Sequence, residues 1–123
     1  MPILFTRRSR REGGEPIALA ESQVVALYQA VCDAGVVDLV DTEMDNDPAD
    51  IARVREAARR GGQALVLSFH DFRATPEPAV LLHKFLQAER LGADVAKLAV
   101  MPRSMEDVHA LLGALLQAQR AVG

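Results

Sequence analysis

The sequence is poor in aromatic residues and in sulfur: among 123 residues there is no tryptophan, one tyrosine and one cysteine. A single cysteine excludes an internal disulfide, and Cys32 stands at an apolar position of a helical pattern, so we expect it to be a small buried residue. There is no apolar run of about 18 residues and no apolar signal region at the N-terminus. We therefore expect a soluble, cytoplasmic protein that has no membrane partner.

Net charge and length further narrow the class of protein. Fourteen basic and 17 acidic residues give a formal net charge of −3, which argues against a general nucleic-acid partner. Half of the residues are hydrophobic, enough for a packed core, and this core must be mainly aliphatic because aromatic residues are few. The length fits one domain, which we place at residues 1–123.

The strongest local signal is the apolar run 64–69, which lies between Gly61-Gly62 and Pro76 and is typical of a strand buried on both faces. Apolar runs predict three more strands, and helical periodicity, glycines and prolines predict helices between them. The predicted strands are 1–6, 36–40 running on to 43, 63–72 and 95–101, and the predicted helices are 20–34, 47–60, 75–91 and 104–122. Regular alternation in units of about 30 residues predicts an α/β fold with a parallel sheet and right-handed crossovers.

Side chains alternate along a strand, so residues two apart share a face of the sheet. On this basis each predicted strand sends polar side chains to one face near its carboxyl end. They are Thr6 and Arg8, Asp41 and Glu43, Ser68 and His70, and Lys97. The carboxyl ends of parallel strands are where α/β proteins bind ligands, so we expect the functional site there.

Residue types alone allow more than one role for the side chains on this face. Lys97 interrupts an apolar strand, and it either pairs with a carboxylate or is a desolvated amine able to form a Schiff base. His70 is either a structural histidine or an acid/base group. Carboxylates together with an imidazole suit hard or borderline cations, and the candidates are Asp41, Glu43, Asp45 and His70. These residues lack a fixed metal-binding spacing, so we expect no metal.

The segment 7–11, R-R-S-R-R, comes before these candidate residues in the sequence. It is either a solvated loop or, through Arg8, a bidentate grip on a carboxylate or phosphate. Glu12 follows directly before Gly13 and Gly14, in a loop expected to lie over the mouth of the sheet.

Four segments in this order resemble type I 3-dehydroquinate dehydratase, the Schiff-base enzyme of the shikimate pathway. They are F-T-R-R-S-R-R-E-G-G-E at 5–15, V-D-L-V-D-T-E at 37–43, S-F-H-D-F at 68–72 and G-A-D-V-A-K-L-A-V-M-P at 92–102. The resemblance covers essentially the whole sequence, and four motifs in the right order make it specific.

The resemblance implies three catalytic residues. Lys97 matches the lysine that forms an imine with the ketone of the substrate, 3-dehydroquinate. His70 matches the general acid/base that removes the C2 proton and protonates the departing hydroxyl. Glu12 matches the acid that holds and polarises this histidine. The reaction is a carbon–oxygen lyase step that uses no metal and no organic cofactor.

The resemblance also implies the groups around the substrate. Arg8 and Glu12 are expected to contact it, and Asp41 and Glu43 correspond to acidic residues at the end of the neighbouring strand. All four are therefore candidate substrate-binding residues.

The family has the (β/α)8 TIM-barrel fold of about 250 residues, whereas this sequence supplies about four βα units, a half-barrel. Such a unit has two open edges and an apolar inner face, so we expect it to associate, as a homodimer. One alternative is a catalytically impaired fragment or half-barrel that acts only as an oligomerising module. Another is a different class I Schiff-base barrel enzyme, such as an aldolase.

Overall fold

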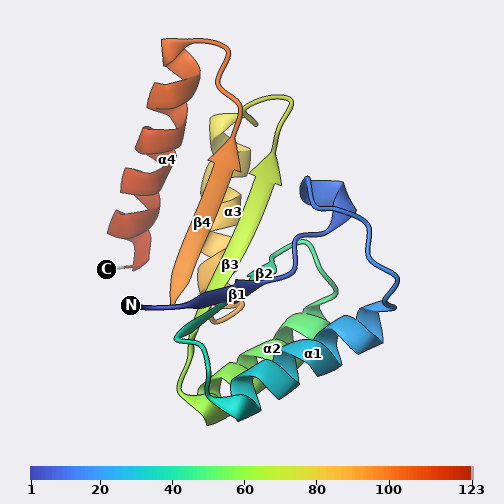
Figure 1. The fold of residues 1–123 in the computed structure, drawn as a ribbon. Coiled ribbons are helices and arrows are strands. Elements are labelled where there is room, and N and C mark those ends of the chain that lie inside the picture. Colours follow the sequence, from blue (N-terminus) through green and yellow to red (C-terminus); the bar gives the residue numbers. More distant parts are fainter. Residues whose placement is uncertain (123) are drawn as a thin grey trace.

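A computed structural model describes residues 1–122, in which strands and helices alternate along the chain (Figure 1). The elements are β1 (Leu4–Thr6), the 3-10 helix η1 (Arg10–Glu12), α1 (Glu21–Ala34), β2 (Leu39–Glu43), α2 (Pro48–Gly61), β3 (Ala64–Asp71), α3 (Pro78–Arg90), β4 (Val95–Val100) and α4 (Met105–Val122). The predicted order of strands and helices is confirmed.

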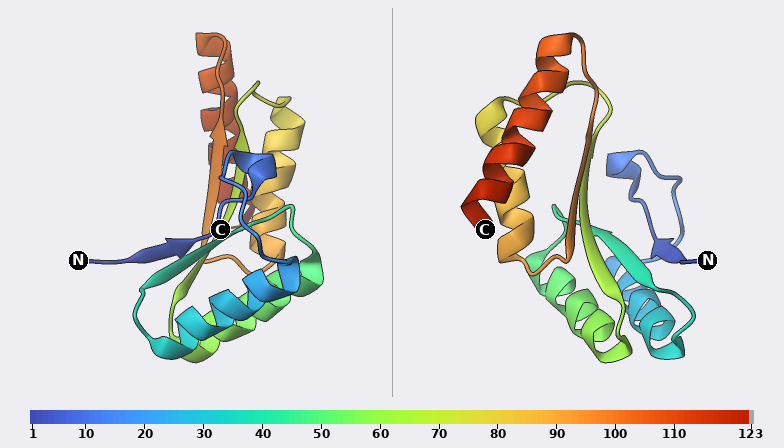
Figure 2. Two further views of the ribbon diagram at one scale, coloured as in Figure 1. Left: turned by 45° about the vertical axis from the view of Figure 1, so that its right-hand side comes forward. Right: turned by 90° about the vertical axis from the view of Figure 1, so that its left-hand side faces the viewer.

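The four strands form one parallel sheet in the order β1-β2-β3-β4. Glu43 lies opposite Ser68, Ser68 lies opposite Lys97, and His70 lies opposite Ala99. The helices lie together on one side of this curved sheet (Figures 1 and 2). α2 packs against β2 and β3, α3 packs against β3 and β4, and α1 and α4 pack mainly on α2 and α3, respectively. This confirms the predicted α/β half-barrel.

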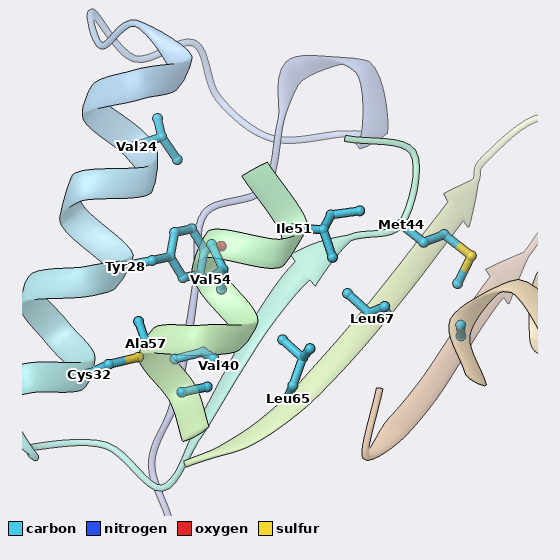
Figure 3. Close-up of a cluster of buried hydrophobic side chains, with 12 residues drawn as sticks. Val24, Tyr28, Cys32, Val40, Met44, Ile51, Val54, Ala57, Leu65 and Leu67 are labelled. Carbon is cyan, nitrogen blue, oxygen red and sulfur yellow. The ribbon is translucent and has the colours of Figure 1, made fainter. Parts of the chain in front are cut away.

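The core lies between the sheet and its helices (Figure 3). Strand residues Val40, Leu65 and Leu67 are almost completely buried there, against α1 and α2. Cys32 belongs to the same cluster and is a free, buried thiol, as expected. A second cluster joins α3 to α4 and is centred on four residues: Leu81, Phe85, Ala114 and Ala118.

The first two strands begin later than the apolar pattern predicts. β1 starts at Leu4, and β2 starts at Leu39 although apolar residues begin at Val36. Val36 is 62% exposed, because it follows directly after the left-handed turn at Gly35 that ends α1. The carboxylate of Asp38 accepts a hydrogen bond from the Ile3 backbone, so this stretch connects the helix to the sheet.

α3 begins at Pro78, later than the predicted start at residue 75. Two backbone N–H groups, of Arg73 and Ala74, donate to the carboxylate of Asp71 and hold the chain in a turn. The Thr75 hydroxyl then donates to the carbonyl of Met101. Because a residue before proline avoids helical geometry, Pro78 itself becomes the first residue of the helix.

The sheet face opposite the helices has no covering layer within residues 1–122. On the two outer strands, Leu4 and Val95 are each 46% exposed. Both β1 and β4 have one side without a paired strand in the described sheet. Separately, no helix in the described part of the chain is both long enough and apolar enough to cross a bilayer.

Leu67→Ala tests the core on the central strand. The side chain is fully buried, so we expect the free energy of unfolding to fall by about 2–5 kcal/mol, from lost transfer energy and a residual cavity. Leu116→Ala on α4 is the matched control, because its side chain is 48% exposed and its loss should cost about 0.5 kcal/mol or less. Urea unfolding followed by circular dichroism measures both, and equal effects would contradict the assigned core.

Candidate functional site

Polar side chains of all four strands gather on the inner face of the sheet, away from the helices. The outward positions of β3, Leu65 and Leu67, are in the core, so alternation turns Ser68 and His70 inward. The cross-strand pairing then places Lys97 next to Ser68 on that same face, diagonally adjacent to His70. The expected sharing of one face is therefore present.

Arg8 is the hub of this face. Its guanidinium lies 3.1 Å from the Asp41 carboxylate and 3.5 Å from that of Glu43, and it donates to Ser68 Oγ at 2.8 Å. Ser68 Oγ in turn donates to Asp41 Oδ1 at 2.6 Å. The carboxylates that Arg8 grips are thus those of its own chain.

Glu43 is 1% exposed, and both of its oxygens receive donors. The backbone N–H of Ser9 donates to Oε2 at 2.7 Å, and the Ser9 hydroxyl donates to Oε1. Arg11 adds a contact of 3.3 Å to Oε1. Burial raises the pKa of Glu43, but the Ser9 hydrogen bonds and the Arg8 charge outweigh it, so the pKa lies below its ordinary value. Glu43 is therefore ionised at neutral pH.

Glu12 is placed against His70 by the 3-10 helix η1. Ser9 caps this helix, since its hydroxyl oxygen accepts the Glu12 N–H at 3.2 Å. Glu12 Oε1 accepts the His70 backbone N–H at 2.8 Å and lies 3.1 Å from His70 Nδ1. Burial, followed by the negative charge of Glu43, raises the pKa of Glu12 to about 7.

Two glycines allow the chain to double back after Glu12. Gly13 has a φ of 94°, and a Cβ there would lie 2.6 Å from the ring of Phe72. A Cβ on Gly14 would lie 1.9 Å from the carbonyl oxygen of Arg8, closer than any atom can approach. The E-G-G sequence therefore delivers the Glu12 carboxyl to the end of β3 by a path open only to glycine.

His70 is a neutral imidazole at neutral pH. Its side chain is 8% exposed, and burial lowers its pKa. The positive charges of Arg8 and Lys97 lower the pKa further, while Asp41 and Glu43 oppose this in part. The ring of Phe72 stacks on that of His70 with centroids 6.1 Å apart. A neutral imidazole held at Nδ1 by Glu12 presents Nε2 as a base.

The sequence left two interpretations for Lys97, a partner of a carboxylate or a desolvated amine. In the structure Lys97 is exposed, because β4 is the outer strand of the described sheet. It borders an apolar hollow of about 500 Å³ with Leu4, Leu39 and Val66. His70 borders a different hollow of about 410 Å³. Lys97 and His70 therefore lie on the same face of the sheet but border different hollows.

Sequence reasoning missed Ser9 and Tyr28. Ser9 is buried and links Glu43 to η1, and the pattern S-x-x-E at 9–12 is the capping signature that could have revealed it. The Tyr28 hydroxyl donates to the carbonyl of Asp41 at 2.6 Å and accepts the Arg7 N–H at 2.8 Å. Nothing in the sequence near Tyr28 indicates this long-range link. Within residues 1–122, no group of three or more His, Cys, Asp or Glu side chains is arranged to hold a metal ion.

The family model for type I 3-dehydroquinase matches residues 1–122. The chain belongs to the type I 3-dehydroquinase family. Among members of this family, the 3-dehydroquinate dehydratase of Albidiferax ferrireducens is 57% identical over 120 residues, which are 98% of this chain and 46% of that protein. The corresponding protein of Aromatoleum aromaticum is 45% identical over 122 residues, 99% of this chain and 47% of its own length.

Solved structures of family members agree with the fold. The crystal structure of 3-dehydroquinate dehydratase from Geobacillus kaustophilus superposes with a TM-score of 0.92 at 50% identity, covering 97% of this chain and 46% of that one. The type I enzyme from Clostridium difficile, with covalent modified comenic acid, gives a TM-score of 0.88 at 35% identity, over 93% of this chain and 45% of that one. The chain thus spans about half the length of the relatives it matches.

Arg8→Ala tests the hub. It removes the cation paired with the buried Asp41 and one of the two cations paired with the buried Glu43, so we expect the free energy of unfolding at pH 7 to fall by about 3 kcal/mol. The folded-state pKa of Glu43 is below its unfolded value, so Glu43 stabilises the fold above about pH 4.5 and ceases to do so as the pH falls through the lower folded-state pKa. The deficit of the variant should therefore shrink in acid, which urea unfolding over a pH series measures.

Arg53→Ala is the matched control for this substitution. Arg53 is 58% exposed and pairs with Asp50 on the surface of α2, so its loss should cost about 0.5 kcal/mol or less at every pH. A similar loss in both variants would contradict the hub role of Arg8.

Proposed function

We propose that this chain provides the catalytic half of a 3-dehydroquinate dehydratase, which converts 3-dehydroquinate to 3-dehydroshikimate through an imine on Lys97. The observation that carries the proposal is a neutral His70, held by Glu12, on the same sheet face as Lys97 and one strand away. Membership of the family supports it. Metal and organic cofactors have no part in the proposed reaction.

The proposed reaction removes one water from the substrate overall. The Lys97 amine adds to the ketone, and loss of water leaves an imine, an electron sink next to C2. His70 takes the C2 proton, and the electron pair expels the hydroxyl, which departs as water with the proton from His70. Hydrolysis of the imine then returns the carbonyl and frees the amine.

The geometry favours different roles for the four candidate substrate-binding residues. Arg8 and Glu12 border the inner face beside His70 and remain our candidates for substrate contact. Asp41 and Glu43 are 2% and 1% exposed and are bonded to Arg8, Ser9 and Ser68. We assign them the role of holding the other groups in place.

Borohydride trapping tests the imine. Sodium borohydride with 3-dehydroquinate should leave a reduced adduct on Lys97 of the unmodified chain, detected by mass spectrometry, and Lys97→Ala should leave none. His70→Ala should still form some adduct while lowering turnover, followed by the absorbance of the enone product, by about 10²–10⁴-fold. His83→Ala, at an exposed position on α3, is the matched control and should change neither readout.

These outcomes separate the alternatives. Normal turnover in His70→Ala would rule out the acid/base role. An adduct with an aldolase substrate, and none with 3-dehydroquinate, would move the chain to a different class of Schiff-base enzyme. The absence of any adduct would favour a catalytically silent half-barrel.

We also propose that two copies of the chain form a homodimer in the cytoplasm. The two outer strands, β1 and β4, run in the same direction. A two-fold axis roughly parallel to the strands would therefore pair β4 of each copy with β1 of the other. The exposed inner-face residues Leu4 and Val95 would then be covered, and Lys97 would lose water. Desolvation favours the uncharged amine that imine formation needs.

Analytical ultracentrifugation tests this assembly. We expect a dimer for the unmodified chain and a monomer for Val95→Glu, because a carboxylate on the inner face would be buried without a partner. Val80→Glu on α3, which is exposed to a similar extent at 43%, should remain dimeric. A monomer of the unmodified chain that turns over substrate would contradict the proposal.

A further inference from the structure

One oxygen of Glu12 has no partner although it is buried. Oε1 receives the His70 backbone N–H, but Oε2 has no hydrogen-bond partner among the described residues. A carboxylate oxygen buried in this way costs free energy, because no donor replaces its lost water. A proton on this oxygen would remove the difficulty, because the oxygen then becomes a donor that needs only an acceptor.

Glu43 is the acceptor beside it. Ser9 ties the two glutamates together, since its hydroxyl oxygen accepts the Glu12 N–H while its hydrogen goes to Glu43. Arg11 also reaches both carboxyls, 3.8 Å from Glu12 Oε2 and 3.3 Å from Glu43 Oε1. The negative charge of Glu43 and a side-chain hydrogen bond with it both raise the pKa of Glu12, so the two carboxyls interact directly and are not both fully ionised without repulsion.

The surroundings decide which of the two holds the proton. Glu43 faces Arg8 from the start of the loop and receives both donors of Ser9, so it is the better-stabilised anion. Glu12 faces Glu43 on β2 and, more distantly, Asp45. On β3 it faces the uncharged His70, and within its own loop only the exposed Arg11 offers a positive charge.

We propose that Glu43 is a positioning residue that shares one proton with Glu12, and that this proton keeps the His70 imidazole neutral with its hydrogen on Nδ1. A protonated Glu12 carries no full negative charge that would draw a second proton to His70. Its Oε1 still accepts the Nδ1 hydrogen, which leaves the lone pair of Nε2 free for the substrate. Glu12 would then be a neutral orienting group and not a permanently charged partner.

The pair also provides a proton store for the reaction, and this part of the inference depends on the proposed function. When His70 takes a proton from substrate, the imidazolium stands beside Glu12. The Glu12 proton then passes to Glu43, so that Glu12 carries the negative charge next to the imidazolium, and the proton returns to Glu12 when His70 gives its own proton away. No atom other than hydrogen moves in this exchange.

The unmodified chain gives the first test, without substrate. Carbon-13 labelling of glutamate side chains and NMR titration report the midpoint of each carboxyl. We expect Glu12 to titrate near 7 and Glu43 below 4.5, and we expect nitrogen-15 shifts of His70 to show the neutral ring with hydrogen on Nδ1 at neutral pH. Ordinary midpoints for both glutamates would overturn the proposal.

Glu43→Gln gives the second test. The amide removes the negative charge and can donate to Glu12 Oε2, so the Glu12 midpoint should fall by about 1–3 pH units and that of His70 should rise. Glu21→Gln, at an exposed ion pair with Arg7, is the matched control and should leave both midpoints unchanged. An unaltered Glu12 midpoint in the Glu43 variant would overturn the shared proton.

Ser9→Ala covers the case in which the Glu43 variant does not fold. It removes the hydroxyl that caps η1 and bonds to Glu43, so the midpoint of Glu43 should rise and that of Glu12 should change with it. Unchanged midpoints for both would overturn the link. Failure of borohydride trapping on Lys97 would remove the proposed function and leave these titrations intact, so the two results are distinguishable.

Discussion

A single guanidinium holds the inner face of this sheet together. Arg8 stands after β1, and its contacts reach Asp41 and Glu43 on β2 and Ser68 on β3. Two buried carboxylates so close together would repel one another and seek water without this cation. The loop that carries Glu12 starts at the same residue, so the ion pairs that join the strands also determine where the acid beside His70 begins its path.

The polar network on this face controls charge as much as shape. Its positive groups, Arg8 and Lys97, favour an uncharged imidazole, while its negative groups oppose that effect. Within the same few ångströms one glutamate is stabilised as an anion and the other is pushed towards its neutral form. Pairs of titratable groups whose environments drive their pKa values apart are typical of sites that handle protons near pH 7.

Local sequence patterns were sufficient to predict the strands and helices. Side chains on one face recur every two residues in a strand and about every 3.6 residues in a helix, and both periods can be read within a short segment. Alternation along β3 put Ser68 and His70 on one face, and the structure has them there. The ends of elements depend on distant partners, so they were harder to predict. Thr75 was expected to open α3, but its hydroxyl bonds to the carbonyl of Met101, 26 residues later.

The sequence was sufficient to predict most of the residues that belong to the site, but not their exposure or their hydrogen bonds. The exposure of Lys97 depends on what lies opposite β4, which no pattern within the strand reports. Ser9 begins a recognisable capping pattern, but it lies within a run of arginines that was interpreted by its charge alone. Tyr28 lies on the apolar stripe of α1, and its two hydrogen bonds to distant backbone groups exist only once the sheet has formed.

The path of the chain at Gly13 and Gly14 has a consequence for how this protein can vary. A methyl group at position 14 would overlap the carbonyl of Arg8, and one at position 13 would strike the Phe72 ring. The contact at position 14 is with the backbone of the loop itself, and Gly13 also has a φ of 94°, which residues with a side chain rarely adopt. A library of variants selected only for a well-folded product, with catalysis ignored, would therefore still retain this dipeptide, whereas the neighbouring exposed arginines would drift.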